Sequence, residues 1–352
     1  MEVHLHNIAL DELSKLSIEK LQQKHNSHIC RIFRAAQDGL VDIVCVTAFE
    51  LPEEVRSYYY KILDMGGMGS CRDRVHFVAP EMAGRLPSTL STSKLLSYSP
   101  KTLARIRKLV AGRPAYVMSS QPTSEDIQVS LQLNMPLFAG DPSKHRYFST
   151  KCGSRSLFKR LQMPVLKGGY DIYNMEELIN TLAILIYSNP RTLRWFLKID
   201  NEIEGRGLAV VSINSFAAIR TFTRALNHTS IIAAEFTETE VIKAIAEELS
   251  ADLEQRLKVC DKQAYSTSKS FLDAFLLRGG VVEAGAAPSE NKVTSLAINF
   301  IIEPNGECTV VSSHEKLSQG HKTIGCICPC QKTCEVNVEH VARSLHRHLW
   351  HQ

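Results

Sequence analysis

The sequence lacks an apolar run long enough to cross a membrane. Its longest aliphatic stretches, such as "LAILIY" at 182–187, are far shorter than the roughly 20 residues that a membrane-spanning helix needs. The N-terminus also lacks a basic region followed by an apolar one, so no secretory signal is predicted. We therefore expect a soluble protein of the cytoplasm with no membrane partner.

The sequence also lacks an excess of one charge. Its 41 Lys and Arg residues nearly balance 37 Asp and Glu residues, and the net charge of +4 is spread along the chain. Nucleic-acid-binding domains concentrate basic residues in a patch or tail, so no nucleic-acid partner is expected. With 352 residues, of which 44% are hydrophobic, the chain is long enough for two or three domains with separate cores.

Several catalytic signatures are missing. No GxxxxGK[ST] segment occurs, which excludes a P-loop, and no G-x-S-x-G segment supports a hydrolase. The "GGMG" at 66–69 lacks the third glycine of a dinucleotide fingerprint and follows a predicted helix, so we interpret it as a loop. The histidine-rich "EHVARSLHRHLWH" at 339–351 has no HExxH arrangement, which excludes a zincin.

Cysteines are mostly isolated. Six of the ten are scattered singly, as free thiols are in a reducing compartment, and four lie in "CICPCQKTC". Cys326, Cys328, Cys330 and Cys334 have thiolates that suit zinc or copper(I), but the CxxC spacing of a zinc knuckle is missing. Free thiols in a connecting segment are the favoured interpretation, and no metal site is assigned.

The first half of the chain is predicted to be an α/β domain. Residues 1–35 are expected to form an N-terminal helical extension, because the leucines of "LDELSKLSIEKLQQK" recur near a 3.6-residue period. In 36–148, apolar runs such as "DIVCVTAFE" at 42–50 and "AYVMSS" at 115–120 alternate with helical patterns such as "PKTLARIRKLV" at 100–110. This alternation predicts a parallel, Rossmann-like sheet with crossover helices.

The second half is predicted to be α+β. "RWFLKID" at 194–200 and "GLAVVSI" at 207–213 are joined by a connection too short for a crossover helix, so they are expected to pair antiparallel. A helical stretch should follow at 236–278. "GGVVEAG" at 279–285 and a hairpin of "TSLAINFIIE" and "CTVVSS" should return to strand, before a final helix over 336–352.

Two segments carry possible phosphate-binding chemistry. Along its strand, Lys198 should point away from the face that holds Trp195, Leu197 and Ile199, and "EGRG" at 204–207 supplies two glycines and an arginine next to it. An edge lysine and ordinary turn glycines would give the same pattern. "TKCGSRSLFKRLQMPV" at 150–165 sets cations along one helix face, which favours either a solvated surface or a second phosphate contact.

Together with "VVEAG", these segments resemble the ATP-grasp superfamily of carboxylate–amine ligases in their order. The resemblance implies a Rossmann-like domain (36–148), a first ATP-grasp subdomain (149–235), a helical segment (236–278) and a second subdomain (279–352). It also implies ATP and magnesium as cofactors. The nucleotide-binding positions that it implies are Lys151 and Lys198 as the two lysines, Gly205, Arg206 and Gly207 as a flexible phosphate loop, and Glu283 as the hinge glutamate.

Longer segments, including "WFLKIDNEIEGRGLA" and "GGVVEAGAAPSENKVTSLAINFIIEPNGE", resemble the ATP-grasp region of a family of IQ-motif-containing proteins over about residues 40–350. The single Ile-Gln pair, Ile127-Gln128, is not followed by the arginines of an IQ motif. A calmodulin partner is therefore expected only through regions outside this chain.

The same resemblance implies late strands with an acidic residue and an Asn pair that hold magnesium, and the chain ends at Gln352 before them. Glu303 and Glu307 flank a turn and do not replace those ligands. The expected chain is a fragment or a shortened isoform with an incomplete ATP-grasp fold, which binds a nucleotide weakly. No catalytic residue is assigned. The alternatives are an ATP-dependent ligase in the full-length form, or a non-catalytic, calmodulin-linked scaffold.

Overall fold

A computed structural model describes residues 1–8, 18–67, 69–87, 89–227, 237–285, 295–303, 305–319 and 322–330. The chain divides into two units, Met1–Arg146 and Tyr147–Gln352, close to the boundary expected at residue 148. Each unit is described by itself.

The first unit is built on a five-stranded parallel sheet with the order β3-β2-β1-β4-β5. Its strands are β1 (Glu2–Leu5), β2 (Ile43–Val46), β3 (Val75–Val78), β4 (Tyr116–Ser119) and β5 (Leu137–Phe138). Its helical elements are α2 (Ile18–Ser27), η1 (His28–Phe33), α3 (Arg34–Gln37), α4 (Glu53–Met65), η2 (Gly69–Arg74), α5 (Thr92–Ser97), α6 (Pro100–Val110) and α7 (Ser124–Leu133), with α8 (Pro142–Phe148) at the unit boundary.

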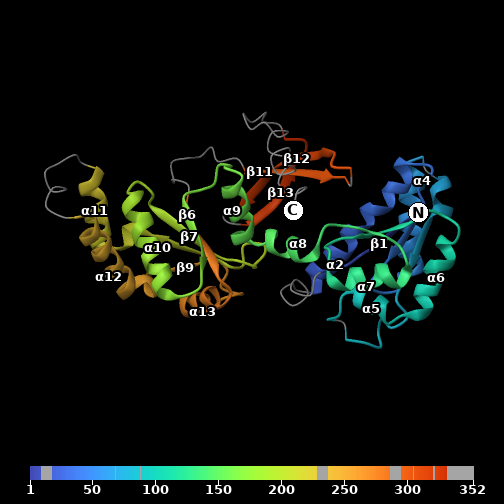
Figure 1. Ribbon diagram of the computed structural model, residues 1–352, viewed down its shortest axis with the longest axis horizontal. Coiled ribbons are helices and arrows are strands. Elements are labelled where there is room, and N and C mark those ends of the chain that lie inside the picture. Colours follow the sequence, from blue (N-terminus) through green and yellow to red (C-terminus); the bar gives the residue numbers. More distant parts are fainter. Residues whose placement is uncertain are drawn as a thin grey trace. The chain divides into compact units, whose positions relative to one another are not determined.

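Helices cover both faces of this sheet (Figure 1). On β2, Val44 and Val46 belong to a core shared with α5, α6 and α7, whereas Ile43 and Cys45 belong to a second core shared with α3 and α4. Successive side chains of a strand point to opposite faces, so a strand apolar at every position is buried on both sides. The expected Rossmann-like arrangement is confirmed.

The expected helical extension at 1–35 is wrong for its first residues. Glu2–Leu5 form β1, which pairs in parallel with β2 on one side and β4 on the other. Val3 and Leu5 are fully buried, while Glu2 and His4 bond to each other on the opposite face. Because Glu2 and His4 are polar, this segment lacks the continuous apolar run that indicates a buried strand in a sequence. Helix α2 confirms the helical pattern from Ile18 onward, and residues 9–17 lie outside the described part of the chain.

The second unit contains a five-stranded antiparallel sheet with the order β6-β10-β7-β8-β9. The strands are β6 (Gly168–Ile172), β7 (Arg194–Ile199), β8 (Leu208–Ser212), β9 (Lys258–Val259) and β10 (Gly280–Ala284). The helical elements are α9 (Lys151–Arg160), α10 (Met175–Ser188), η3 (Ile213–Ser215), α11 (Ala217–Asn227), α12 (Glu238–Arg256) and α13 (Ser268–Arg278).

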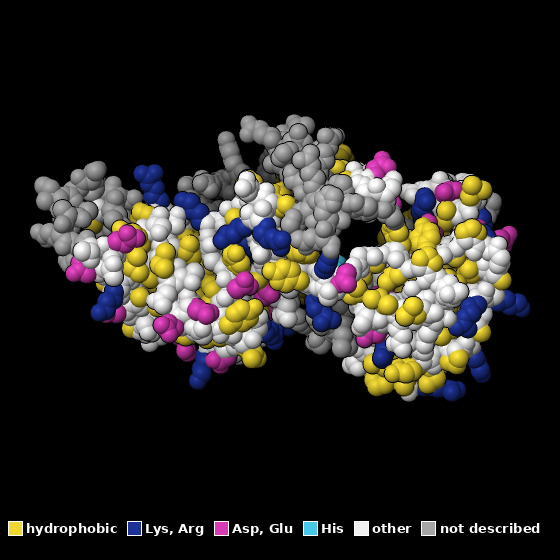
Figure 2. Space-filling model, in the orientation of Figure 1, with side chains coloured by type: hydrophobic (Ala, Val, Ile, Leu, Met, Phe, Trp, Pro, Cys, Tyr) yellow, Lys and Arg dark blue, Asp and Glu magenta, His cyan; other side chains and the backbone are white. Residues whose placement is uncertain are grey.

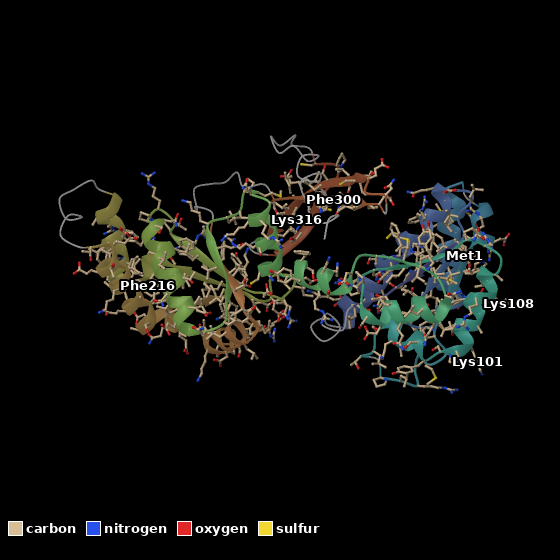
Figure 3. All side chains as sticks on the ribbon, viewed as in Figure 1. Met1, Lys101, Lys108, Phe216, Phe300 and Lys316 are labelled. Carbon is tan, nitrogen blue, oxygen red and sulfur yellow. The ribbon has the colours of Figure 1, made fainter. Side chains whose placement is uncertain are left out.

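One core joins this sheet to α10, α11, α12 and α13. Phe216, labelled in Figure 3, is fully buried in it, whereas Lys101 and Lys108 of α6 in the first unit are exposed. The antiparallel pairing of β7 with β8 is confirmed. The structure differs from the expected subdivision into 236–278 and 279–352, because α12 and α13 pack in the core of the sheet that contains β7, and β10 is a strand of that same sheet.

A third, antiparallel sheet contains β11 (Ser295–Ile302), β12 (Cys308–Gln319) and β13 (Lys322–Ile327). The pairing of β11 with β12 confirms the expected hairpin. Within the described ranges, no disulfide involves Cys326, Cys328 or Cys330, and no group of three possible metal-ligating side chains occurs. Cys334 and the predicted final helix lie outside those ranges.

We predict that Glu2 stabilises the first unit in a pH-dependent way. Burial alone raises the pKa of Glu2, but hydrogen bonds from His4 and Tyr116 and the charge of Arg34 outweigh burial and lower the pKa from 4.5 to about 2. Ionised Glu2 therefore stabilises the fold above pH 4.5, by about 3 kcal/mol, and this stabilisation is lost as the pH falls toward 2.

Denaturant unfolding of Glu2→Gln should show the full loss at pH 6 and little difference from wild type near pH 2. Glu54→Gln, at an exposed position of α4, is the control. The prediction fails if Glu2→Gln matches wild type at pH 6.

Candidate functional site

Strand β7 presents two different faces. Trp195, Leu197 and Ile199 are fully buried in the core, while Lys198 lies on the opposite face with 31% of its side chain exposed. The predicted direction of Lys198 is confirmed. This face, opposite to the helical core, is where the candidate site lies.

Glu283 lies on the neighbouring strand β10 and contacts two cations. Its Oε2 accepts a hydrogen bond from Lys198 Nζ, and its Oε1 accepts one from Arg155 Nη1 at 2.9 Å. The register explains the first contact, because Lys198 lies opposite Val281, two residues from Glu283 on the same side of β10. The structure therefore brings together Lys198 and Glu283, two of the residues singled out in the sequence.

Arg155 comes from α9, which contacts β10 and β6. Its side chain is only 5% exposed, and it also donates to the carbonyl oxygen of Leu166. A buried guanidinium is tolerated when carboxylate and carbonyl acceptors surround it, as they do here. Lys159, on the same helix, is exposed and lies 4.5 Å from the ring centroid of Tyr170. The cations of α9 thus divide between a buried ion pair and the surface.

Lys151, the first residue of α9, holds the end of β7. Its Nζ donates to the carbonyl oxygens of Ile199 at 2.9 Å, Asp200 at 3.1 Å and Glu202 at 2.6 Å. An ammonium has three donors, and these contacts use all of them. The Asp200 carboxylate accepts from the backbone N–H of Cys152 at 2.6 Å, where the positive end of the helix dipole favours an anion.

The loop between β7 and β8 is anchored by the buried carboxylate of Glu202. Its Oε1 accepts from Tyr265 Oη at 2.8 Å and from Arg278 Nη1 at 2.7 Å, both on or next to α13. Arg206 forms an ion pair with its Oε2 at 3.4 Å. Burial, followed by the hydrogen bond to Glu202, raises the pKa of Tyr265 to about 12, so the phenol stays protonated and donating.

Two loop glycines have different structural reasons. Gly205 has φ of +76°, in the left-handed region that other residues rarely adopt. A Cβ on Gly207 would lie 2.5 Å from Glu202 Cβ and 2.9 Å from Ile199 Cβ, so this position has no room for a side chain. The resemblance implies that this loop is flexible. In the structure, Gly207 of the loop packs closely against Glu202, the residue that anchors the loop.

No pattern in the sequence indicated a role for four residues of this region, which are Glu202, Tyr265, Arg278 and Asp200. Glu202 and Arg278 are separated by 76 residues, and Arg155 and Glu283 by 128 residues. Neither spacing matches a local sequence motif. In the sequence, Arg155 could be identified only as one of several cations in the helix predicted within 150–165. Figure 2 shows basic and acidic side chains interspersed over the described surface in view, as the near balance of charge predicts.

A family profile and a curated relative point to the same family. The profile described as "IQCH-like, ATP-grasp" matches residues 142–349. IQ motif-containing protein H of Danio rerio is 28% identical over 352 aligned positions, which cover 94% of this chain and 32% of that protein. The chain therefore spans about a third of the length of this relative.

Solved structures match the fold. The biotin carboxylase domain of 2-oxoglutarate carboxylase from Hydrogenobacter thermophilus, determined with MgADP, ADP and bicarbonate, has a TM-score of 0.50 and 12% identity, covering 98% of this chain and 57% of that chain. A biotin carboxylase–beta-gamma-ATP complex from Campylobacter jejuni has a TM-score of 0.49 and 11% identity, covering 98% and 58%. The expected α/β and α+β ATP-grasp-like fold class is confirmed.

We predict that Gly207→Ala destabilises the second unit by about 1–3 kcal/mol, because the added Cβ collides with Glu202 and Ile199. Urea unfolding would measure this loss. Gly325→Ala on β13 is the matched control, since its Cβ would meet only Leu317 at an ordinary 3.9 Å. Equal stability of the two variants would contradict the packing described here.

We also predict unequal costs for the two partners of an ion pair. Glu283→Ala leaves Arg155 buried without a carboxylate and should cost roughly 3–5 kcal/mol. Lys198→Ala removes a partly exposed cation while Arg155 still neutralises Glu283, and should cost less than about 1 kcal/mol. Chemical unfolding of both variants tests this, and similar losses would show that Arg155 is not the dominant partner.

Proposed function

We propose that the chain binds a nucleotide, because it belongs to the IQCH-like ATP-grasp family, whose profile matches more than half of its residues. We propose that ATP binds on the face of the second unit's sheet that carries Lys198 and Glu283. The observation that supports this most directly is the Lys198–Glu283–Arg155 cluster. It sets a partly exposed cation beside a carboxylate whose other oxygen is already held.

The cluster suits a nucleotide because Lys198 and Arg155 bond to different oxygens of Glu283, so one contact can change while the other stays. Lys198 Nζ has the charge and exposure to neutralise phosphate oxygens. When it turns to a phosphate, Arg155 continues to hold Oε1 of Glu283 in place, and Oε2 becomes available as an acceptor. That oxygen can then accept a hydrogen bond from a ribose hydroxyl or an adenine amino group.

The loop residues support the same proposal in a different role. Gly205 and Gly207 carry no side chain of their own, and we propose that phosphate oxygens approach their backbone N–H groups. Arg206 can leave Glu202 for a phosphate at low cost, since Arg278 and Tyr265 still bond to that carboxylate. Lys151 fixes the position of the loop through three carbonyl oxygens, and we propose that it acts mainly in this way.

For magnesium, the described residues offer no corresponding set of side chains. Within the described ranges no three Asp, Glu, His or Cys side chains are grouped as metal ligands. We therefore propose magnesium only as the ion that accompanies the ATP phosphates. The role that we propose for Lys198, Glu283 and Arg206 is binding and orientation, and no ligation step is assigned to them.

We place any calmodulin contact outside this chain. Ile127 and Gln128 lie on α7, whose last turn has no basic residue, so the described helix lacks the charge of a calmodulin-binding segment. The Danio rerio relative, named for its IQ motif, is about three times as long as the aligned region. No described helix has both the length and the apolar character to cross a bilayer, and we propose the cytoplasm as the location.

Calorimetric titration with Mg·ATP tests the proposal. We predict saturable binding to wild type and a loss of at least about tenfold in affinity in Lys198→Ala, because a charge-assisted hydrogen bond to phosphate is removed. Lys258→Ala, at an exposed position of β9 in the same sheet, is the control and should bind like wild type. An absence of heat with wild type would overturn the proposal, and unchanged affinity in Lys198→Ala would remove Lys198 from the site.

A further inference from the structure

The exposed face of α6, in the first unit, is basic. Lys101, Arg105 and Lys108 follow one another at intervals of four and three residues, so they lie on one side of the helix, and all three are exposed. Lys101 and Lys108 are labelled in Figure 3. Residues 100–113 contain no Asp or Glu. The other side of α6 is buried in the core of the first unit, so the helix is held in place with its charged side outward.

The stability of α6 does not explain this face. None of its three cations forms an ion pair with another residue that the structure describes. Arg113, just after the helix, is already paired with Asp42, and the Glu81 carboxylate accepts from the backbone N–H groups of Lys101 and Thr102. Like charges three or four residues apart destabilise a helix, and the helix dipole disfavours a cation in the first turn. An anionic partner would relieve both costs.

Helix α12, in the second unit, carries the opposite charge. It has six acidic side chains and two basic ones. Glu247 and Glu254 are exposed, seven residues apart, and neither belongs to an ion pair within the described part of the chain. Ser250 and Ala251 lie between them on the same side and are also exposed. This face is therefore acidic at its two ends and has short side chains in the middle.

The two faces match in spacing as well as in charge. Seven residues of an α-helix span about 10.5 Å, so Lys101 and Lys108 are as far apart along α6 as Glu247 and Glu254 are along α12. Two helices placed side by side would form both ion pairs at once. Arg105 would then lie opposite the short side chains of α12, which leave room for its guanidinium group.

We propose that the chain associates with a second copy of itself, with α6 of one copy lying along α12 of the other. Lys101 and Lys108 then pair with Glu247 and Glu254. A second copy is favoured over an unrelated acidic or basic partner because it neutralises both faces at once. The contact joins two unlike surfaces, so further copies can add in the same way. This proposal does not depend on nucleotide binding.

The association should be weak and sensitive to salt. Exposed ion pairs contribute little individually, so we expect a dissociation constant on the order of 100 µM. Sedimentation velocity of the full chain from about 0.02 to 0.5 mM should show a mass that rises with concentration at about 0.05 M salt. Association should be at least about tenfold weaker at about 0.5 M salt, because screening shortens the reach of the charges. A monomer throughout the range at low salt, or association that salt does not weaken, would overturn the proposal.

Charge reversal tests the pairing directly. Lys101→Glu/Lys108→Glu and Glu247→Lys/Glu254→Lys should each self-associate at least about tenfold more weakly than wild type, because like charges then meet. An equimolar mixture of the two variants should recover association, since each contact between them again joins opposite charges. The formal net charge of +4 shifts by four in each variant, to 0 and +8, so attraction between oppositely charged chains does not account for recovery. A mixture that stays monomeric would refute the pairing.

The matched control is Lys61→Glu/Lys262→Glu, which reverses two exposed lysines outside α6 and gives the same net charge of 0. It should associate like wild type, and an equal loss in this control would show that net charge alone governs association. Lys101→Gln/Lys108→Gln removes the charges without adding carboxylates near Glu81. If the reversed α6 variant fails to fold, this neutral variant replaces it, and wild-type association in it would overturn the proposal.

Discussion

The second unit depends on the pairing of β10 between β6 and β7. All five residues of β10 pair with β7, and three of them (Gly280, Val282 and Glu283) also pair with β6, so without β10 those two strands would not belong to one sheet. The fit is close, because a Cβ on Gly280 would lie 2.2 Å from the ring of Phe275 and 2.6 Å from the carbonyl oxygen of Lys198. The same pairing sets Glu283 within hydrogen-bonding distance of both Lys198 and Arg155. The core and the candidate site therefore have one structural origin.

The contrast between Arg155 and Lys198 supports the proposal that one carboxylate, Glu283, serves both structure and binding. Arg155 is buried and bonded to fixed acceptors, so it holds Glu283 at a defined position. Lys198 is partly exposed and its stem is flexible, so it can exchange partners with a small loss of free energy. The neighbouring loop follows the same logic, since Glu202 has two close partners, Tyr265 at 2.8 Å and Arg278 at 2.7 Å, while Arg206 has the longer contact at 3.4 Å. Pre-organised positions of this kind reduce the cost of binding.

Patterns in the sequence predicted those structural features that depend on residues close together in the chain. The alternation along "RWFLKI" predicted which side of β7 is buried, and the short connection to β8 predicted their antiparallel pairing. The place of β10 in the sheet was not predictable, because its partners lie about 80 and 110 residues away. β1 was missed since its polar residues face helices that supply Arg34 as a partner. The roles of Lys198 and Glu283 were suggested by resemblance, but no spacing rule connects Arg155 to Glu283.

β1 also shows how much of the first unit depends on one short strand. The middle strand of the first sheet is made of residues 2–5, yet one of its two neighbours is β4 at 116–119. During synthesis, β1 lacks its partner on that side until more than a hundred further residues have been added. Loss of these four residues would separate β2 and β3 from β4 and β5. A change confined to one short strand would thereby dismantle the sheet of a unit of nearly 150 residues.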